Sequence, residues 1–188
     1  MTLQWARWRL VSIGLVLLAA LAGDRVAAQS ATSADIKAAF LFNFAKFVEW
    51  PASDPDPQSV VIGVLGNDAI ADSLSEMVKG KALQGGRRLS ARKLSRKDDP
   101  ATVHILFIGA SESALIPEVM KRLGYGTRNV LTVSDADRFC VLGGIIQFRA
   151  EADRIRFDIH LQNAQTAGLT INSKLLSLAG AVHSSKSP

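Results

Sequence analysis

The chain has 188 residues, a formal charge of +5 and a single cysteine. This length suits one domain with a hydrophobic core, and a single cysteine excludes an intramolecular disulfide. The charge is too mild to argue for a nucleic-acid partner.

Residues 1–28 have the pattern of a secretory signal peptide. Two arginines precede an apolar run at 10–23, and Val26 and Ala28 stand where a small-residue cleavage site requires them. A membrane anchor is the rival interpretation, but the run is about 14 residues long and a span needs roughly 20. We expect cleavage after Ala28 and export of the mature chain. The removed segment carries three arginines and one aspartate, so the charge falls from +5 to about +3.

The first folded element is expected to be a helix over residues 34–50, which includes the stretch "NFAKFVEWP". Thr32 or Ser33 can cap it, and Pro51 disfavours helical geometry in the residue before it. Phe42 lies on the polar side of this helix, so it is either covered by the same chain or used for a partner. The apolar face carries Ile36, Phe40, Leu41, Phe44, Phe47 and Val48.

The middle of the chain alternates between strands and helices. Apolar, β-branched runs bounded by turn residues predict buried strands, and apolar residues at helical spacing predict amphipathic helices. A weaker strand should follow the turn in "ALQGGRRLSARKL". The expected strands lie at 60–66, 103–109 and 129–135, and the helices at 67–80 and 111–124, the latter ended or bent by Pro117.

The last third predicts a hairpin within residues 143–161. In its second limb Arg154, Arg156, Asp158 and His160 alternate with apolar residues, which favours one buried and one solvent-exposed face. Short helices split near Gly168 should follow, and then a polar tail at 182–188. The class is α/β, with one domain over 33–181. A mostly parallel sheet core is flanked by helices and carries a C-terminal antiparallel hairpin.

Motifs for catalysis are missing from the sequence. Gly63 and Gly66 give only G-x-x-G, a poor match to a dinucleotide-binding loop. None of the histidines aligns with a nucleophile, and no spacing fits a metal site. We therefore expect no enzyme activity, no cofactor and no metal.

Two local features allow alternatives. The basic run at 85–97 is either a solvated strand and loop or a contact surface for an acidic partner or anionic lipid. Cys140 is either a buried, inert and unbridged thiol, which its apolar neighbours favour, or a residue that pairs between chains.

Taken together, the chain resembles the YfiR family of small periplasmic regulators. The resemblance covers nearly everything from Ile36 to Gly180. The most specific blocks are the first and the last, and the middle strands alone would fit many α/β proteins. The matching pieces are "IKAAFLFNFAKFVEWP", "VIGVLGNDAIADSL", "VHILFIG", "VLTVSDADRFCVLGGIIQF" and "RIRFDIHLQNAQTAGLTINSKLLSLAG".

The resemblance implies a homodimeric negative regulator without catalytic activity. Such a protein binds the periplasmic domain of an inner-membrane diguanylate cyclase and represses it, which lowers cyclic-di-GMP and affects biofilm formation. An outer-membrane lipoprotein is a further partner that the resemblance implies.

The resemblance also implies a role for particular residues. Asp158 matches an acidic position implicated in repression, and Arg154, Arg156 and Phe42 are further candidates for partner binding. Relatives often carry a second cysteine a few residues beyond the one matching Cys140. This chain has Gln147 in that neighbourhood and no thiol, which argues against redox sensing.

A periplasmic small-molecule sensor or carrier is the alternative function. Its ligand would lie at the carboxyl ends of the parallel strands, near Gly66, Gly109 and Asp135.

Overall fold

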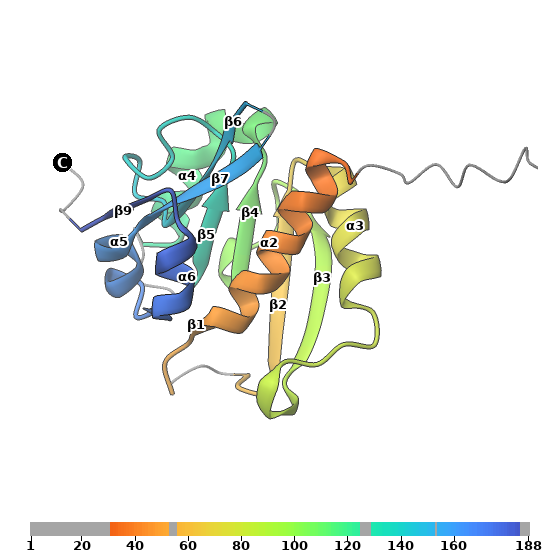
Figure 1. Ribbon diagram of the computed structural model, residues 1–188. Helices are drawn as coiled ribbons and strands as arrows, with labels where there is room; N and C mark the ends of the chain where they lie inside the picture. The colour runs from red at the N-terminus through yellow and green to blue at the C-terminus, as the bar shows by residue number, and fades with distance from the viewer. Residues whose placement is uncertain (1–30, 53–55, 125–128, 153, 185–188) are drawn as a thin grey trace, which may run out of the picture. The chain divides into compact units, whose positions relative to one another are not determined.

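The computed structural model of the protein describes residues 31–52, 56–124, 129–152 and 154–184 (Figure 1). The expected signal peptide, residues 1–28, and the end of the expected tail lie outside these ranges. The elements in chain order are α2 (Ser33–Phe47), β1 (Val48–Glu49), β2 (Ser59–Leu65), α3 (Asp68–Val78), η1 (Gln84–Gly86), β3 (Arg88–Leu94), η2 (Pro100–Thr102), β4 (Ile105–Ile108), η3 (Ala110–Leu115), α4 (Ile116–Arg122), β5 (Leu131–Ser134), β6 (Ile146–Glu151), β7 (Arg154–His160), α5 (Leu161–Thr166), β8 (Thr170–Ile171), α6 (Ser173–Leu178) and β9 (Ala181–His183).

A mixed sheet forms the centre of this part of the chain, with the strand order β3-β2-β4-β5-β6-β7-β9. The five strands from β3 to β6 in this order run parallel. Strand β7 then pairs antiparallel with β6, and β9 pairs parallel with β7. The predicted α/β class, with a mostly parallel sheet and a C-terminal antiparallel hairpin, is confirmed.

Helices cover both faces of the sheet. Helices α2, α3, α5 and α6 bury their apolar residues in one core cluster, and η3 and α4 bury theirs in a second cluster on the other face. Figure 1 shows α2 crossing in front of the sheet and α4 behind it. The phenylalanines of "NFAKF" belong to the first cluster: the ring centroid of Phe44 lies 5.9 Å from that of Phe148 and 5.2 Å from that of Phe157. Burial of each such ring contributes about 1.5–3 kcal/mol.

Helix α2 begins where the sequence predicts and ends three residues early. Thr32 and Asp35 form a reciprocal capping box at its start. The helix was expected to run to residue 50, but it stops at Phe47 because Val48 and Glu49 pair with β8 as strand β1. The N–H of Val48 still donates to the carbonyl of Phe44 as the helix cap, whereas the carbonyl of Phe47 accepts the N–H of Asn172 at 2.9 Å instead of a further helical N–H.

Pro117 starts a helix rather than ending one. The segment expected as a single helix over 111–124 consists of the 3-10 helix η3 followed by α4, and Pro117 lies in the first turn of α4. At that position the missing N–H of proline has no helical partner to lose.

The C-terminal tail is partly structured. Residues 182–188 were expected to be a polar tail, yet Val182 and His183 belong to β9 and extend the sheet. Strand β9 covers the inner half of β7, so Asp158 and His160 are buried instead of solvent-exposed. The prediction of one solvated face on this hairpin therefore holds only for its outer end.

Candidate partner-binding surface

Asp158, the main candidate for partner binding, is held inside the hairpin by Arg149. Arg149 Nε lies 2.6 Å from Asp158 Oδ2, and its Nη2 donates to Oδ1 at 2.9 Å. The side chain of Asp158 is 13% exposed and that of Arg149 is 44% exposed. A two-point pair of this kind fixes both side chains, so Asp158 shapes the surface and Arg149 presents the charge to solvent.

Gly180 allows the chain to pass close to this pair. Its N–H donates to the carbonyl of Phe157 at 2.8 Å. A Cβ at Gly180 would lie 3.1 Å from Arg149 Nη2 and 3.3 Å from Asp158 Oδ1. The ion pair therefore stands directly under the entry to β9, a relation between distant segments that the sequence analysis missed.

Arg154 and Arg156 lie at the outer, solvent-exposed end of β7. Both side chains are exposed, and Arg156 Nε is 3.7 Å from the carboxylate of Glu151 across the hairpin. The structure thus places the two arginines on the strand of Asp158 but beyond the part that β9 covers. They remain available to a partner.

Phe42 is far from this hairpin end in sequence and is covered partly by its own chain. It packs against the first core cluster, with Lys46 Nζ 4.0 Å and Lys81 Nζ 5.1 Å from its ring centroid. Cation–π contacts of this kind explain how an aromatic ring is accommodated on the polar side of α2.

Cys140 lies buried beside the same hairpin. Its thiol contacts the carbonyl of Ile145 at 3.7 Å, and its backbone N–H donates to Gln147 Oε1 at 3.3 Å. Burial, and to a smaller degree the negative charge of Asp158, raise the pKa of the thiol to about 12. Reaction requires the thiolate, so burial and the raised pKa both disfavour reaction of Cys140 at neutral pH, and Gln147 serves as a hydrogen-bond acceptor beside it.

Two histidines meet where β7 and β9 pair. His160 and His183 are partners in register, with ring centroids 6.3 Å apart. His160 Nδ1 accepts the N–H of Asn163 and so caps α5. Burial, and then the neighbouring His183, lower the pKa of His160.

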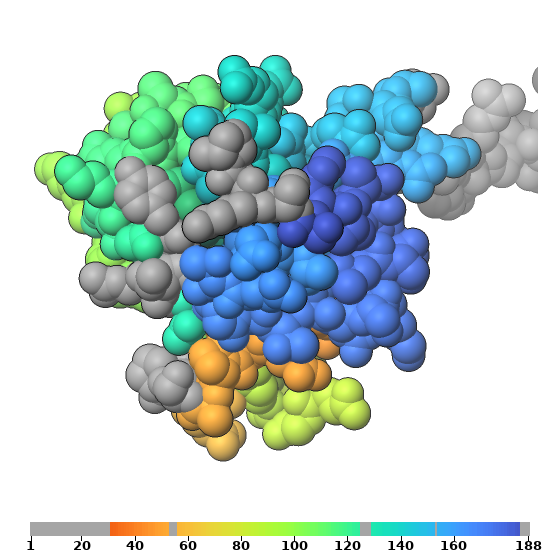
Figure 2. All heavy atoms as spheres, turned by 90° about the vertical axis from the view of Figure 1, so that its left-hand side faces the viewer, coloured from red at the N-terminus to blue at the C-terminus, as the bar shows by residue number. Residues whose placement is uncertain are grey.

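Four large apolar side chains are exposed on segments next to this hairpin. The loop before β6 carries Val141 and Leu142, and it is tied to α5 because Asn163 Nδ2 donates to the carbonyls of Cys140 and Gly144. Leu178 and Val182 belong to α6 and β9. The exposed fractions of the four side chains range from 43% to 60%. Figure 2 faces this side of the molecule, with α6 and β9 in dark blue beside the lighter blue of β6 and β7.

Two cations of the basic run at 85–97 pair with carboxylates of the same chain. Lys93 Nζ lies 3.0 Å from Asp72 and 3.5 Å from Asp68, and Arg96 Nη2 lies 3.0 Å from Glu112. The interpretation as a solvated strand and loop accounts for these contacts, and the strand in question, β3, is an edge of the sheet.

The carboxyl ends of the parallel strands are filled by the protein itself. Gly66 has a φ of 79° and allows the tight turn into α3, and Ser111 Oγ donates to its carbonyl at 2.7 Å. Asp135 accepts the N–H of Ala110 at 2.7 Å and pairs with Lys37 at 2.5 Å. The proposed ligand position near Gly66, Gly109 and Asp135 is therefore occupied by atoms of the protein itself, and Lys37 forms a partly buried ion pair there.

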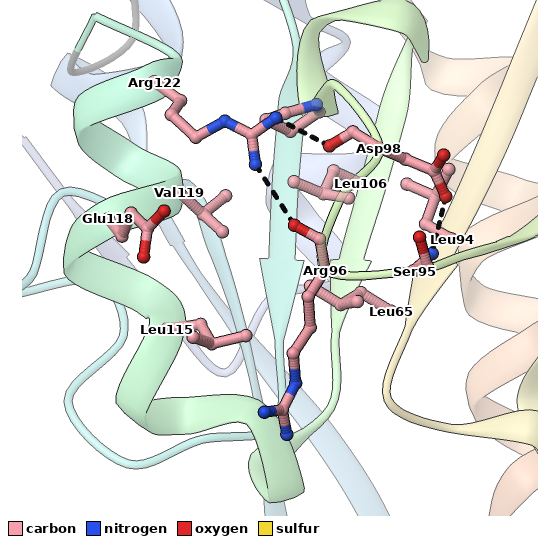
Figure 3. Close-up of a pocket in the computed structure, with 11 residues that line it drawn as sticks. Leu65, Leu94, Ser95, Arg96, Asp98, Leu106, Leu115, Glu118, Val119 and Arg122 are labelled. Carbon is pink, nitrogen blue, oxygen red and sulfur yellow. Dashed lines mark hydrogen bonds between the residues drawn. The ribbon is translucent and has the colours of Figure 1, made fainter.

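A small pocket of about 250 Å³ lies between α4 and the loop after β3 (Figure 3). Leu115 and Val119 point into it from the helical side. Arg122 closes one end, because its Nη2 donates to the carbonyl of Asp98 at 2.7 Å. The guanidinium is thus used to join α4 to this loop.

Membrane-spanning helices and metal clusters are absent from the described part of the chain. None of its helices has the length and apolar character to cross a bilayer. No three side chains among its His, Cys, Asp and Glu residues gather to hold a metal ion.

The fold and this surface define a class: a three-layer α/β protein with exposed apolar residues beside a charged hairpin. The model of the YfiR/HmsC-like family matches residues 34–180. The chain belongs to this family. Its members are periplasmic regulators of diguanylate cyclases rather than enzymes.

Likeness to one solved structure supports the fold alone. A conserved domain protein from Vibrio cholerae O1 biovar eltor is 15% identical, with a TM-score of 0.51, and the match covers 80% of this chain and 60% of that one. An ABC domain from Streptococcus pneumonia, solved in complex with L-Trp, is 12% identical with a TM-score of 0.47, covering 65% of this chain and 56% of the other. The chain therefore spans less than two thirds of the length of either.

Proposed function

We propose that this protein binds the periplasmic domain of an inner-membrane diguanylate cyclase and holds the enzyme in its inactive state, which lowers cyclic-di-GMP. Membership of the YfiR/HmsC-like family over residues 34–180 is the observation that carries this proposal. Physically, such a regulator acts only through a higher affinity for the inactive form of its partner.

The surface around the β6–β7 hairpin supports the proposal. Interfaces combine exposed apolar anchors with a charged rim. Here Leu142 and Val182 supply apolar contacts, while Arg154 and Arg156 supply charge at the outer end of β7. Asp158 then acts by holding Arg149 and β9 in place rather than by touching the partner directly.

The proposal extends to cellular location and assembly. The expected signal peptide at residues 1–28 would deliver the chain to the periplasm, where it would work as a homodimer. An outer-membrane lipoprotein that competes for the same surface would release the cyclase and so favour biofilm formation.

Deletion of the gene tests the function. We expect cyclic-di-GMP to rise in the deletion strain and to return when the wild-type chain is supplied. A parallel measurement by calorimetry should show direct binding between the purified chain and the periplasmic domain of the cyclase. Unchanged cyclic-di-GMP together with no binding would refute the proposal.

A further inference from the structure

A second concave site lies away from the hairpin, between the end of α2 and the loop before β3. We define the Trp50 groove as the hollow lined by residues 45–50 and 82–85 together with Arg87, with a volume of about 710 Å³. This volume is in the range of sites for small organic molecules, roughly 300–1,000 Å³. Figure 2 shows the two walls side by side at the lower edge, in orange and yellow-green.

The inner wall of the groove is aromatic and held rigidly. The Arg87 guanidinium carbon lies 5.5 Å from the ring centroid of Trp50, and the ring of His104 packs edge-on at 5.7 Å. Arg87 Nη2 also donates to the carbonyl of Ser59 at 3.1 Å. These contacts hold the indole in place, and Trp50 contributes a preformed apolar surface to the lining of the groove.

The indole of Trp50 also carries a donor that its surroundings do not use. Its Nε1 is buried and has no hydrogen-bond partner among the described residues. A buried N–H of this kind costs about 1–3 kcal/mol unless an acceptor is supplied. A bound molecule whose acceptor displaces the atoms that cover this N–H would remove that cost.

The charged residues of the groove indicate which charge a bound molecule would carry. Among the described lining residues, Lys46 and Arg87 are cations and Glu49 is a carboxylate. Lys81 stands beside the wall residue Ala82, and its ammonium lies 5.1 Å from the Phe42 ring. The excess of cations at the rim favours an anion, and the indole favours a planar body.

We propose that the Trp50 groove binds a small aromatic anion, with its acidic group near the cationic rim and its ring against Trp50. The site is separate from the surface around the β6–β7 hairpin, and it replaces the filled strand ends as the place where a ligand would act.

Binding of three probes with the same ring and different charge tests this proposal. The chain contains Trp5, Trp8 and Trp50, so Trp50 is the only fluorophore of this type in the exported form. We expect benzoate to change its emission with saturation, and benzyl alcohol and benzylamine to bind at least about ten-fold more weakly because they lack the negative charge.

Two variants locate the site. Lys46→Gln combined with Lys81→Gln should weaken benzoate binding, whereas Lys121→Gln combined with Lys174→Gln, exposed lysines on α4 and α6, should leave it unchanged. Trp50→Phe keeps a ring but removes the donor, and ligand-observed NMR should show about five-fold weaker binding.

Three outcomes would overturn the proposal. One is benzylamine binding as well as benzoate, and another is no saturable response to benzoate. The third is emission that depends on protein concentration and not on benzoate, which would assign the groove to a second copy of the chain.

Discussion

Arg149 pairs with Asp158 diagonally across the β6–β7 ladder. In register, Arg149 faces Arg156, and Gln147 faces Asp158. Like charges placed directly opposite each other destabilise a sheet, and the carboxylate of Asp158 compensates because it takes two contacts from the Arg149 guanidinium. The hairpin is thus organised around a cross-strand charge pattern, from which the first prediction follows.

Asp158→Asn should destabilise the fold. The substitution keeps the shape of the side chain but leaves Arg149 opposite Arg156 without its counter-charge. Arg149 is partly exposed and can turn to solvent, so we expect a loss of roughly 1–3 kcal/mol in the free energy of unfolding, measured by urea denaturation. Arg154→Gln, at the exposed end of the same strand, should cost less than about 0.5 kcal/mol. Equal stability of Asp158→Asn and wild type would contradict a clamping role and favour direct contact with the partner.

Acid should loosen the contact between β7 and β9. The pKa of His160 is lowered from 6.5 by burial and by His183, so below that pH the unfolded chain binds a proton that the folded chain resists. The free energy of unfolding should therefore fall as pH drops below about 6.5, in a comparison of urea unfolding at neutral and acidic pH. His160→Asn keeps an acceptor for the start of α5 and should show a smaller fall. If both proteins lose stability equally, the histidine pair is not the cause.

Alkaline pH should lower the free energy of unfolding through ionisation of Cys140. Its pKa is raised from 9.0 to about 12, so between these values the unfolded thiol ionises while the folded thiol stays neutral. The contribution of the Cys140 thiol to the free energy of unfolding is fully present below pH 9 and is lost as the pH rises toward 12. The difference in unfolding free energy between wild type and Cys140→Ala should shrink by up to about 1.4 kcal/mol per pH unit in this window.

The same burial predicts slow alkylation of the Cys140 thiol in the folded protein. Iodoacetamide should modify the native thiol far more slowly than the thiol in urea. Rapid labelling of the folded protein, or a disulfide-linked dimer under oxidising conditions, would show that the residue is accessible after all.

Acidic substitutions in the exposed apolar residues should weaken partner binding. Leu142→Glu and Val182→Glu place a charge where we propose apolar contact with the cyclase, and loss of such an anchor costs about 1–2 kcal/mol or more. Calorimetry with the periplasmic domain of the cyclase measures the effect. Ala114→Glu, exposed on η3 against the other face of the sheet, is the matched control. Wild-type affinity in both variants would place the interface elsewhere.

Sequence patterns were sufficient to predict secondary structure and burial wherever a segment's environment follows from its own residues. The buried strands are continuous apolar runs, and Asn67 caps α3 at the residue where the expected helix begins. The phenylalanines of "NFAKF" were read correctly as core because their spacing places them on one side of α2. Local periodicity carries this kind of information directly.

Errors arose where a distant segment decides the outcome. Asp158 and His160 alternate like exposed residues, but pairing of β7 with Ala181 and its neighbours buries them. Likewise, pairing with β8 draws Val48 out of the helix that its own sequence would continue. The short alternation after Gly180 was the signal available for β9, and it is too brief to distinguish from a tail.

The two edges of the sheet differ in a way that limits how copies of the chain could associate. The β3 edge carries Arg88, Arg92 and Lys93, whereas β9 contains no Lys, Arg, Asp or Glu and includes the exposed Val182. Two copies meeting at β3 would repel each other, and lysine on an edge strand is a common protection against such contact. Joining at β9 by a two-fold axis would use that edge in both copies. Association of copies through their sheet edges would then stop at a dimer and could not continue into a fibre.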